Sequence, residues 1–336
     1  MTTGLTEALD RELARVGARG HRAVAAGVLD GDERACRGWA ADGTAPDGAS
    51  LFEIGSITKV FTGVLLAEMT LRGEVSLDDR LSRHLPGPHP AWRHGEPSLL
   101  DLATHRSGLP NTPRPMRHHE LAFAAGLRHR DPWSALTEAD YIHLVRGESP
   151  RSRSGGRFGY SSMGVGLLGD ALAARAGTSY DRLLAERILA PLGMDSTGVA
   201  VPPGPAQRLL GGYSRRGRPR PPLEDLMPAA GSLRSSTEDM LHFLDACLHP
   251  PPGPLGAALR LAQQPHARIG KRLRIGLCWI ILTRPHHPTV VWHNGGTWGF
   301  RSFAGFAPDL DRASVVMTNT TRSVDRLGVS LIHGRP

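Results

Sequence analysis

The chain has 336 residues, of which 40% are hydrophobic and 21% are charged, so it can bury a core and is not a disordered protein. Its formal net charge of +8 raises nucleic acid as a partner, but the basic residues are scattered among acidic ones without any nucleic-acid-binding motif, and we expect no such partner. No apolar run reaches the ~18 residues of a membrane-spanning helix, and we expect no membrane partner.

The N-terminal segment predicts a helix followed by a β-hairpin. Apolar residues recur at helical spacing from Leu5 to Val16. Residues 21–29 and 33–39 then have the composition of two strands, joined by the turn sequence Asp30-Gly31-Asp32. The first twenty residues lack a continuous apolar run, so we expect no signal peptide and a cytoplasmic location. The three isolated cysteines agree with a reducing compartment.

The middle of the chain predicts helices and irregular loops. A buried helix is expected from about Ser56 to Gly73, and a second from Met163 to Ala176. Residues 111–157 contain few long apolar runs and predict a mobile lid over the site. The basic side chains of this segment are Arg114, Arg117, Arg128 and Arg130. They either attract an acidic substrate or are ordinary solvated charges, and we favour the second interpretation. A denser arginine cluster, among prolines and a glycine, indicates an exposed loop at Arg215, Arg216, Arg218 and Arg220.

The C-terminal part predicts an antiparallel meander and a final helix. Four segments look like successive short strands separated by turns, at residues 274–282, 289–293, 302–307 and 313–318. Strands at both ends of a helical middle predict an α/β fold in which both termini form one antiparallel sheet flanked by helices. We expect residues 1–60 plus 265–336 to form the sheet subdomain and residues 61–264 a mainly helical inserted subdomain, with the active site between them.

The sequence Ser56-Ile57-Thr58-Lys59 is the first chemical motif. Ser56 is expected at a helix N-terminus, where serine is a favoured cap, and Lys59 lies one turn later, where it could equally be a solvated charge. The functional interpretation uses the same geometry, because a neutral amine can activate a serine hydroxyl beside the helix dipole. Among 40 basic residues only Lys59 and Lys271 are lysines, and arginine could not take up the proton.

Two further motifs follow. Tyr160, in Gly159-Tyr160-Ser161-Ser162, is either a core residue or a general acid or base. Residues 291–300, Val-Trp-His-Asn-Gly-Gly-Thr-Trp-Gly-Phe, end a strand in a glycine-rich turn. The glycines either make a tight turn or let a substrate carbonyl approach a backbone N–H. Trp298 in this turn either lines an acyl pocket or is an ordinary half-buried aromatic.

Together these three motifs resemble the serine β-lactamase and penicillin-binding-protein superfamily, and most closely its branch of class C β-lactamases, esterases and D-aminopeptidases. Residues 102–110, Leu-Ala-Thr-His-Arg-Ser-Gly-Leu-Pro, and 191–194, Pro-Leu-Gly-Met, agree with it. The resemblance implies Ser56 as the acylated nucleophile, Lys59 and Tyr160 as the groups that move its proton, and the N–H groups of Ser56 and Gly296 as the oxyanion hole. It does not assign the base to one of the two.

The resemblance also implies a substrate-binding set, and here the chain departs from the β-lactamase pattern. The set is Ser162, His293, Asn294, Gly295 and Trp298. Ser162 replaces an asparagine and cannot offer an amide donor and acceptor together. His293-Asn294-Gly295 replaces Lys-Thr-Gly, and a neutral histidine anchors a carboxylate less strongly than lysine. Both changes argue against an efficient penicillinase.

We therefore predict a serine acyl-enzyme hydrolase for a small ester, amide or β-lactam-like substrate, most simply an esterase or amidase. If an amine or alcohol accepts the acyl group instead of water, the protein is a transacylase; a catalytically silent binding protein of the same fold is the other alternative. No metal or cofactor is expected, because the paired histidines His118-His119 and His286-His287 are adjacent and their side chains point apart.

Overall fold

The structure, a computed structural model, describes residues 3–85, 90, 92–128, 130–150, 152–200, 204, 208–223 and 227–334. Its centre is an eight-stranded antiparallel sheet in the order β2-β1-β12-β11-β10-β9-β8-β7. The strands are β1 (Ala23–Asp30), β2 (Glu33–Ala40), β7 (Ala267–Arg268), β8 (Leu273–Ile275), β9 (Ile280–Leu282), β10 (Val290–Gly296), β11 (Arg301–Ala307) and β12 (Arg312–Thr318). The first two strands thus pair with the last one, which confirms a sheet built from both ends of the chain.

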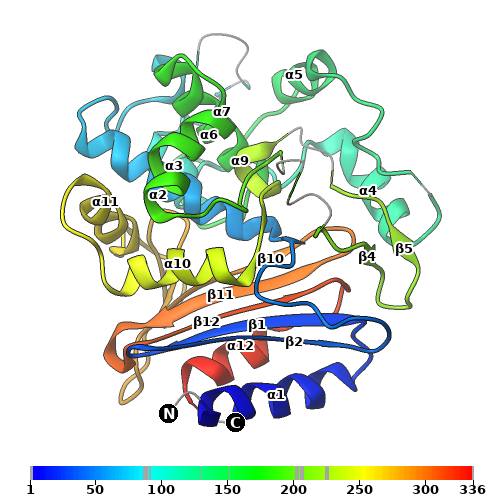
Figure 1. The fold of residues 1–336 in the computed structure, drawn as a ribbon. Helices are drawn as coiled ribbons and strands as arrows, with labels where there is room; N and C mark the ends of the chain where they lie inside the picture. Colours follow the sequence, from blue (N-terminus) through cyan, green and yellow to red (C-terminus); the bar gives the residue numbers. More distant parts are fainter. Residues whose placement is uncertain are drawn as a thin grey trace.

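Two helices cover one face of this sheet, α1 (Thr3–Gly17) and α12 (Asp325–Ile332) (Figure 1). The predicted apolar stripe of α1 supplies Leu9 and Leu13, each 1% exposed, to a core shared with α12. Within β1, alternate residues such as Val24 and Val28 face this layer, and Ala25 faces the other. Because both faces are covered, seven of the eight β1 residues are buried.

The helical layer packs on the opposite face (Figure 1). The long helix α10 lies against β1, β11 and β12, and α2 packs beside α11. The helices of this layer are α2 (Thr58–Leu71), α3 (Leu99–Ala103), α4 (Arg117–Ala124), α5 (Glu138–Arg146), α6 (Ser162–Ala176), α7 (Tyr180–Leu184), α9 (Pro228–Gly231), α10 (Thr237–Leu248) and α11 (Pro254–Gln263). Short 3-10 and π turns are η1 (Gly55–Ile57), η2 (Leu81–Arg83), η3 (Arg114–Met116), η4 (Ala185–Leu189), η5 (Ala190–Leu192) and η6 (Pro308–Leu310).

Two small strand pairs lie outside the main sheet. Strand β3 (Phe52–Glu53) pairs with β6 (Arg234–Ser235), and β4 (Gly212–Tyr213) pairs with β5 (Pro219–Arg220). The α/β fold class is therefore confirmed, while the subdomain boundaries at residues 60 and 265 stay a prediction. No helix in the described part of the chain is long and apolar enough to cross a membrane.

One predicted strand is wrong. Residues 274–282 form two strands, β8 and β9, because the chain reverses between them. Cys278 adopts a left-handed φ of +66°, which local sequence does not predict for a cysteine. The turn is held by tertiary hydrogen bonds, since the N–H of Leu277 donates to the carbonyl of Ala262 and that of Cys278 to the carbonyl of Ala103.

Candidate active site

Ser56 lies in the 3-10 turn η1, directly before α2. Its position at the start of a helix matches the sequence expectation, but its side chain does not cap the helix. Neither η1 nor α2 has a side-chain cap. The hydroxyl instead accepts a hydrogen bond from Nζ of Lys59 at 3.0 Å. The capping explanation for a serine here is therefore not the one that the structure supports.

Lys59 is completely buried, with 0% of its surface exposed. Its Nζ donates to Oγ of Ser56 and, at 2.5 Å, to the carbonyl oxygen of Ala230 in α9. Among the residues that the structure describes, no carboxylate forms an ion pair with Lys59. An ammonium group that is buried without a counter-charge is costly in free energy, so its placement against a serine hydroxyl favours a chemical function.

Tyr160 lies beside Lys59. The ring centre lies 5.1 Å from Nζ of Lys59 and 4.5 Å from the ring centre of His105. The next residue, Ser161, caps α6 by accepting the N–H of Gly164 at 2.9 Å. The helix start thus fixes the backbone that carries the tyrosine.

His105 supports this arrangement, and our sequence analysis gave it no role. It has a left-handed φ of +55°, 1% exposure, and an Nδ1 that accepts the N–H of Ser161 at 3.3 Å. Burial, and then the charge of Lys59, hold its pKa well below the usual value, so the ring is neutral. The signal lay in the segment Leu102–Pro110, which we used only for the family resemblance.

The strand β10 brings the third motif to Ser56. Strand β9 pairs with β10 only from Val290 to Trp292, and beyond that point the free edge of β10 packs on the chain before Ser56. A Cβ on Gly295 would lie 1.9 Å from the carbonyl oxygen of Ile54, and a Cβ on Gly55 2.5 Å from the N of Gly296. Only glycines permit this approach, which puts the backbone of Gly296 beside that of Ser56.

His293 does not lie where we expected a substrate-binding residue. Its side chain is 1% exposed and is not among those that line the cavity described below. Nδ1 lies 2.6 Å from the carbonyl oxygen of Asn294. Burial and the charge of Lys59 lower its pKa to about 4, so the ring is neutral at pH 7 and offers no positive charge to a carboxylate.

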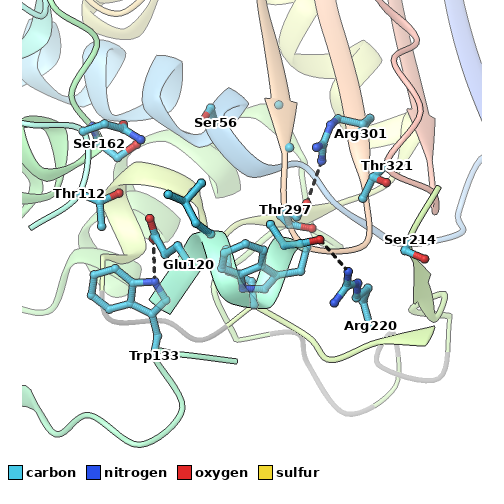
Figure 2. Close-up of a pocket in the computed structure, with 18 of the residues that line it drawn as sticks. Ser56, Thr112, Glu120, Trp133, Ser162, Ser214, Arg220, Thr297, Arg301 and Thr321 are labelled. Carbon is cyan, nitrogen blue, oxygen red and sulfur yellow. Dashed lines mark hydrogen bonds between the residues drawn. The ribbon is translucent and has the colours of Figure 1, made fainter. Parts of the chain in front are cut away.

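A cavity of about 1200 Å³ opens over Ser56. Its walls include Tyr160 and Gly296 and, from the predicted substrate-binding set, Ser162, Asn294, Gly295 and Trp298. Figure 2 shows Ser162 and Thr112 on one side of Ser56, with Arg301 and Thr321 on the other. Ser56 and most of the predicted substrate-binding set therefore line the same cavity.

Helix α4 and the loop after it build one wall of this cavity. Trp298 donates its Nε1–H to Asp131 at 2.7 Å. Trp133 donates its own Nε1–H to Glu120 at 3.0 Å, as Figure 2 shows. Burial raises the pKa of Glu120. Our sequence analysis missed these residues. No group of three or more His, Cys, Asp or Glu side chains in the described ranges could hold a metal ion.

Comparison with known proteins agrees with this geometry. A family model described as Beta-lactamase matches residues 9–330. The chain belongs to the Beta-lactamase family. A similar relative is the D-alanyl-D-alanine-carboxypeptidase/endopeptidase AmpH of Escherichia coli (strain K12), 27% identical over 88% of this chain and 78% of the relative. A Beta-lactamase of the same organism is 25% identical over 80% of this chain and 75% of its own length.

A solved class C β-lactamase shares the fold. It superimposes with a TM-score of 0.82 over 99% of this chain and 95% of its own, at 19% identity. Family membership makes this protein a serine hydrolase that works through an acyl-enzyme.

Proposed function

We propose that this protein hydrolyses small esters or amides and that Ser56 is the residue it acylates. The observation that carries the proposal is the contact of Ser56 with Lys59, a buried lysine whose amine has a serine hydroxyl within 3.0 Å. Once Lys59 has given up a proton, its amine would take the hydroxyl proton as Oγ attacks the substrate carbonyl carbon. The resulting oxyanion would accept hydrogen bonds from the backbone N–H groups of Ser56 and Gly296.

The second half of the reaction returns the enzyme to its starting state. The proton on Lys59 would pass, with help from Tyr160, to the leaving alcohol or amine as its bond to the carbonyl carbon breaks. A water molecule then attacks the carbonyl carbon of the acyl-enzyme and gives a proton to Lys59 or Tyr160. The bond from that carbon to Oγ of Ser56 breaks, the proton passes to Oγ, and the acid is released. Lys59 is the group already hydrogen-bonded to Ser56, which favours it over Tyr160 as the base for the first step.

Esters and simple amides suit the site better than β-lactams for two reasons. Ser162, on the cavity wall, has no amide to hold an amide side chain of the substrate. His293 is buried and neutral and gives no cationic anchor for a carboxylate. The named activities of the relatives, carboxypeptidase and β-lactamase, remain candidate activities with lower expected rates.

The test is intact-protein mass over time after mixing with p-nitrophenyl butyrate, for the wild type and Ser56→Ala. We expect a butyryl adduct on the wild type alone, which decays while p-nitrophenol accumulates. An adduct that persists until an amine or alcohol is added would instead mean a transacylase. If neither protein is labelled, the silent-binding alternative replaces the proposal, and equal labelling of Ser56→Ala would rule out Ser56 as the nucleophile.

A further inference from the structure

The hairpin β4–β5 carries the arginine cluster that the sequence suggested to be an exposed loop. The structure places this cluster on the wall of the cavity that contains Ser56. The base of the hairpin is fixed, because the N–H of Tyr213 donates to the carbonyl oxygens of Gly299 at 3.2 Å and Asn319 at 2.9 Å. Its tip is an ordered turn in which the N–H of Ser214 donates to the carbonyl of Arg218 at 2.8 Å.

Arg220 ties the same hairpin to the wall that α4 builds. Its guanidinium lies 4.9 Å from the ring centre of Phe123 and donates to the carbonyl oxygens of Phe123 and Ala124 in α4. The hairpin therefore bridges the end of the sheet and α4, and its tip is held at the cavity and not free in solution.

The arginines at the tip are not used by the fold. Arg215, Arg216 and Arg218 are exposed, and within the described ranges their side chains make no hydrogen bond or ion pair. The described lining holds one acidic residue, Glu120, whose pKa is raised by burial. It holds six basic ones, Arg117, Arg215, Arg216, Arg218, Arg220 and Arg301. Positive charge that lines a concave site attracts and orients anions.

The wall next to these arginines is apolar. Leu121, Ala124 and Ala125 come from α4 and the residue after it, and Leu223 and Met227 from the chain beyond the hairpin. A small acyl group such as butyryl would leave much of the 1200 Å³ empty. An elongated substrate would reach from Ser56 along this apolar wall to the arginines.

We propose that the natural substrate carries an anionic group several bonds from the carbonyl that Ser56 attacks, and that Arg215, Arg216 and Arg218 select it. The inference rests on the proposed function, since it names the substrate class of the same site. The anion is a carboxylate or a phosphate on either the acyl part or the leaving group.

Matched ester pairs test the inference. Mono-4-nitrophenyl adipate and 4-nitrophenyl hexanoate differ by a terminal carboxylate on the acyl part; 3-carboxyphenyl hexanoate and phenyl hexanoate differ by one on the leaving group. The quantity is the ratio of kcat/KM for the anionic to the neutral ester. In R215Q/R216Q/R218Q we expect this ratio to fall about tenfold in at least one pair. The difference in this ratio between the wild type and the triple variant should shrink at high ionic strength.

The matched control is R268Q/R272Q/R274Q. These three arginines are also exposed and lie on β7, β8 and the turn between them, outside the cavity lining, so the change in net charge is identical. We expect its ratio to equal that of the wild type. A fall in the adipate pair alone assigns the anion to the acyl part, and a fall in the other pair alone to the leaving group. Equal ratios in both triple variants for both pairs overturn the proposal.

A binding measurement separates this inference from the proposed function. Ser56→Ala is titrated calorimetrically with the mono-4-nitroanilide of adipic acid and with 4-nitrohexananilide. We expect tighter binding of the anion, lost in the background of the hairpin triple variant and kept in that of the control. If no ester is turned over but this binding pattern is seen, the proposed hydrolase is refuted and the anion site is kept. If esters are turned over without any preference for the anion, the anion site is refuted and the hydrolase is kept.

Discussion

The proposed mechanism depends most on one side chain, that of Lys59. Its amine has two neutral oxygen partners, Ser56 and the carbonyl of Ala230, and no room for solvent. Lys59→Arg keeps a positive charge but removes the capacity to accept a proton, because a guanidinium stays protonated in proteins. We expect kcat/KM for p-nitrophenyl butyrate to fall by about 10³-fold.

The chain supplies its own control for this variant. Lys271, the other lysine of the sequence, is exposed, and Lys271→Arg should keep wild-type kinetics. If Lys59→Arg retained activity within tenfold of the wild type, proton transfer would have to run through Tyr160 alone.

Some residues of the candidate site could be predicted from the sequence and others could not, for a physical reason. Ser56, Lys59 and Tyr160 belong to short motifs that can be read from the sequence, and their predicted roles come from the resemblance that these motifs carry together. His105 does not, because its contact with Tyr160 depends on a left-handed backbone at one position. Arg215 and its neighbours looked like an exposed loop, and only tertiary contacts of the hairpin bring them to the cavity.

At the scale of elements, the active site depends on the contact between β10 and η1. Gly295 has no space for a side chain, since its Cβ would meet the carbonyl oxygen of Ile54 at 1.9 Å. Gly295→Ala must therefore push the strand away from the turn that carries Ser56. We expect at least a 100-fold loss of kcat/KM, the scale of losing one oxyanion donor, and a lower melting temperature.

Gly4→Ala is the comparison for that variant. Gly4 lies in α1 with nothing within 4 Å of a built Cβ, so alanine should raise helix stability slightly and leave activity unchanged. The measurements are the melting temperature and kcat/KM for p-nitrophenyl butyrate of both variants and the wild type. Wild-type kinetics in Gly295→Ala would show that the strand and the turn are not rigidly coupled.

Elements were predicted well where their signal was local. Helix α1 was predicted from its apolar stripe, and β11 and β12 from their short apolar runs. The turn between β1 and β2 was predicted from the sequence Asp30-Gly31-Asp32. The break at Cys278 has no such local signal, because the carbonyls of Ala103 and Ala262 hold that turn from distant parts of the chain. Periodicity therefore predicted one strand there and the structure has two.

At the scale of the whole molecule, buried histidines make stability depend on pH. Burial, and then the charge of Arg322, lower the pKa of His21 to about 4, whereas the unfolded chain titrates near 6.5. The unfolded state thus binds more protons as pH falls below about 6.5. The stability due to neutral His21 is complete above that pH and is lost toward pH 4. His105 and His293 act in the same direction.

A difference measurement isolates this contribution, because Asp170, whose pKa burial raises to about 7, acts in the opposite direction. Urea unfolding of the wild type and His21→Gln is compared at pH 7 and pH 5. We expect the stability advantage of the wild type to shrink by roughly 1–2 kcal/mol at the lower pH. A difference that is independent of pH would mean that His21 is not held neutral by the fold.

The joining of both chain ends in one sheet has a consequence for the life of the molecule. Ser56 and Lys59 leave the ribosome long before β10, with Gly296, and its neighbours β11 and β12. A nascent or prematurely terminated chain would carry Ser56 without the strand that is proposed to complete its oxyanion hole. Under the proposed mechanism, acyl transfer begins only when translation has delivered the C-terminal strands, so incomplete products are chemically silent.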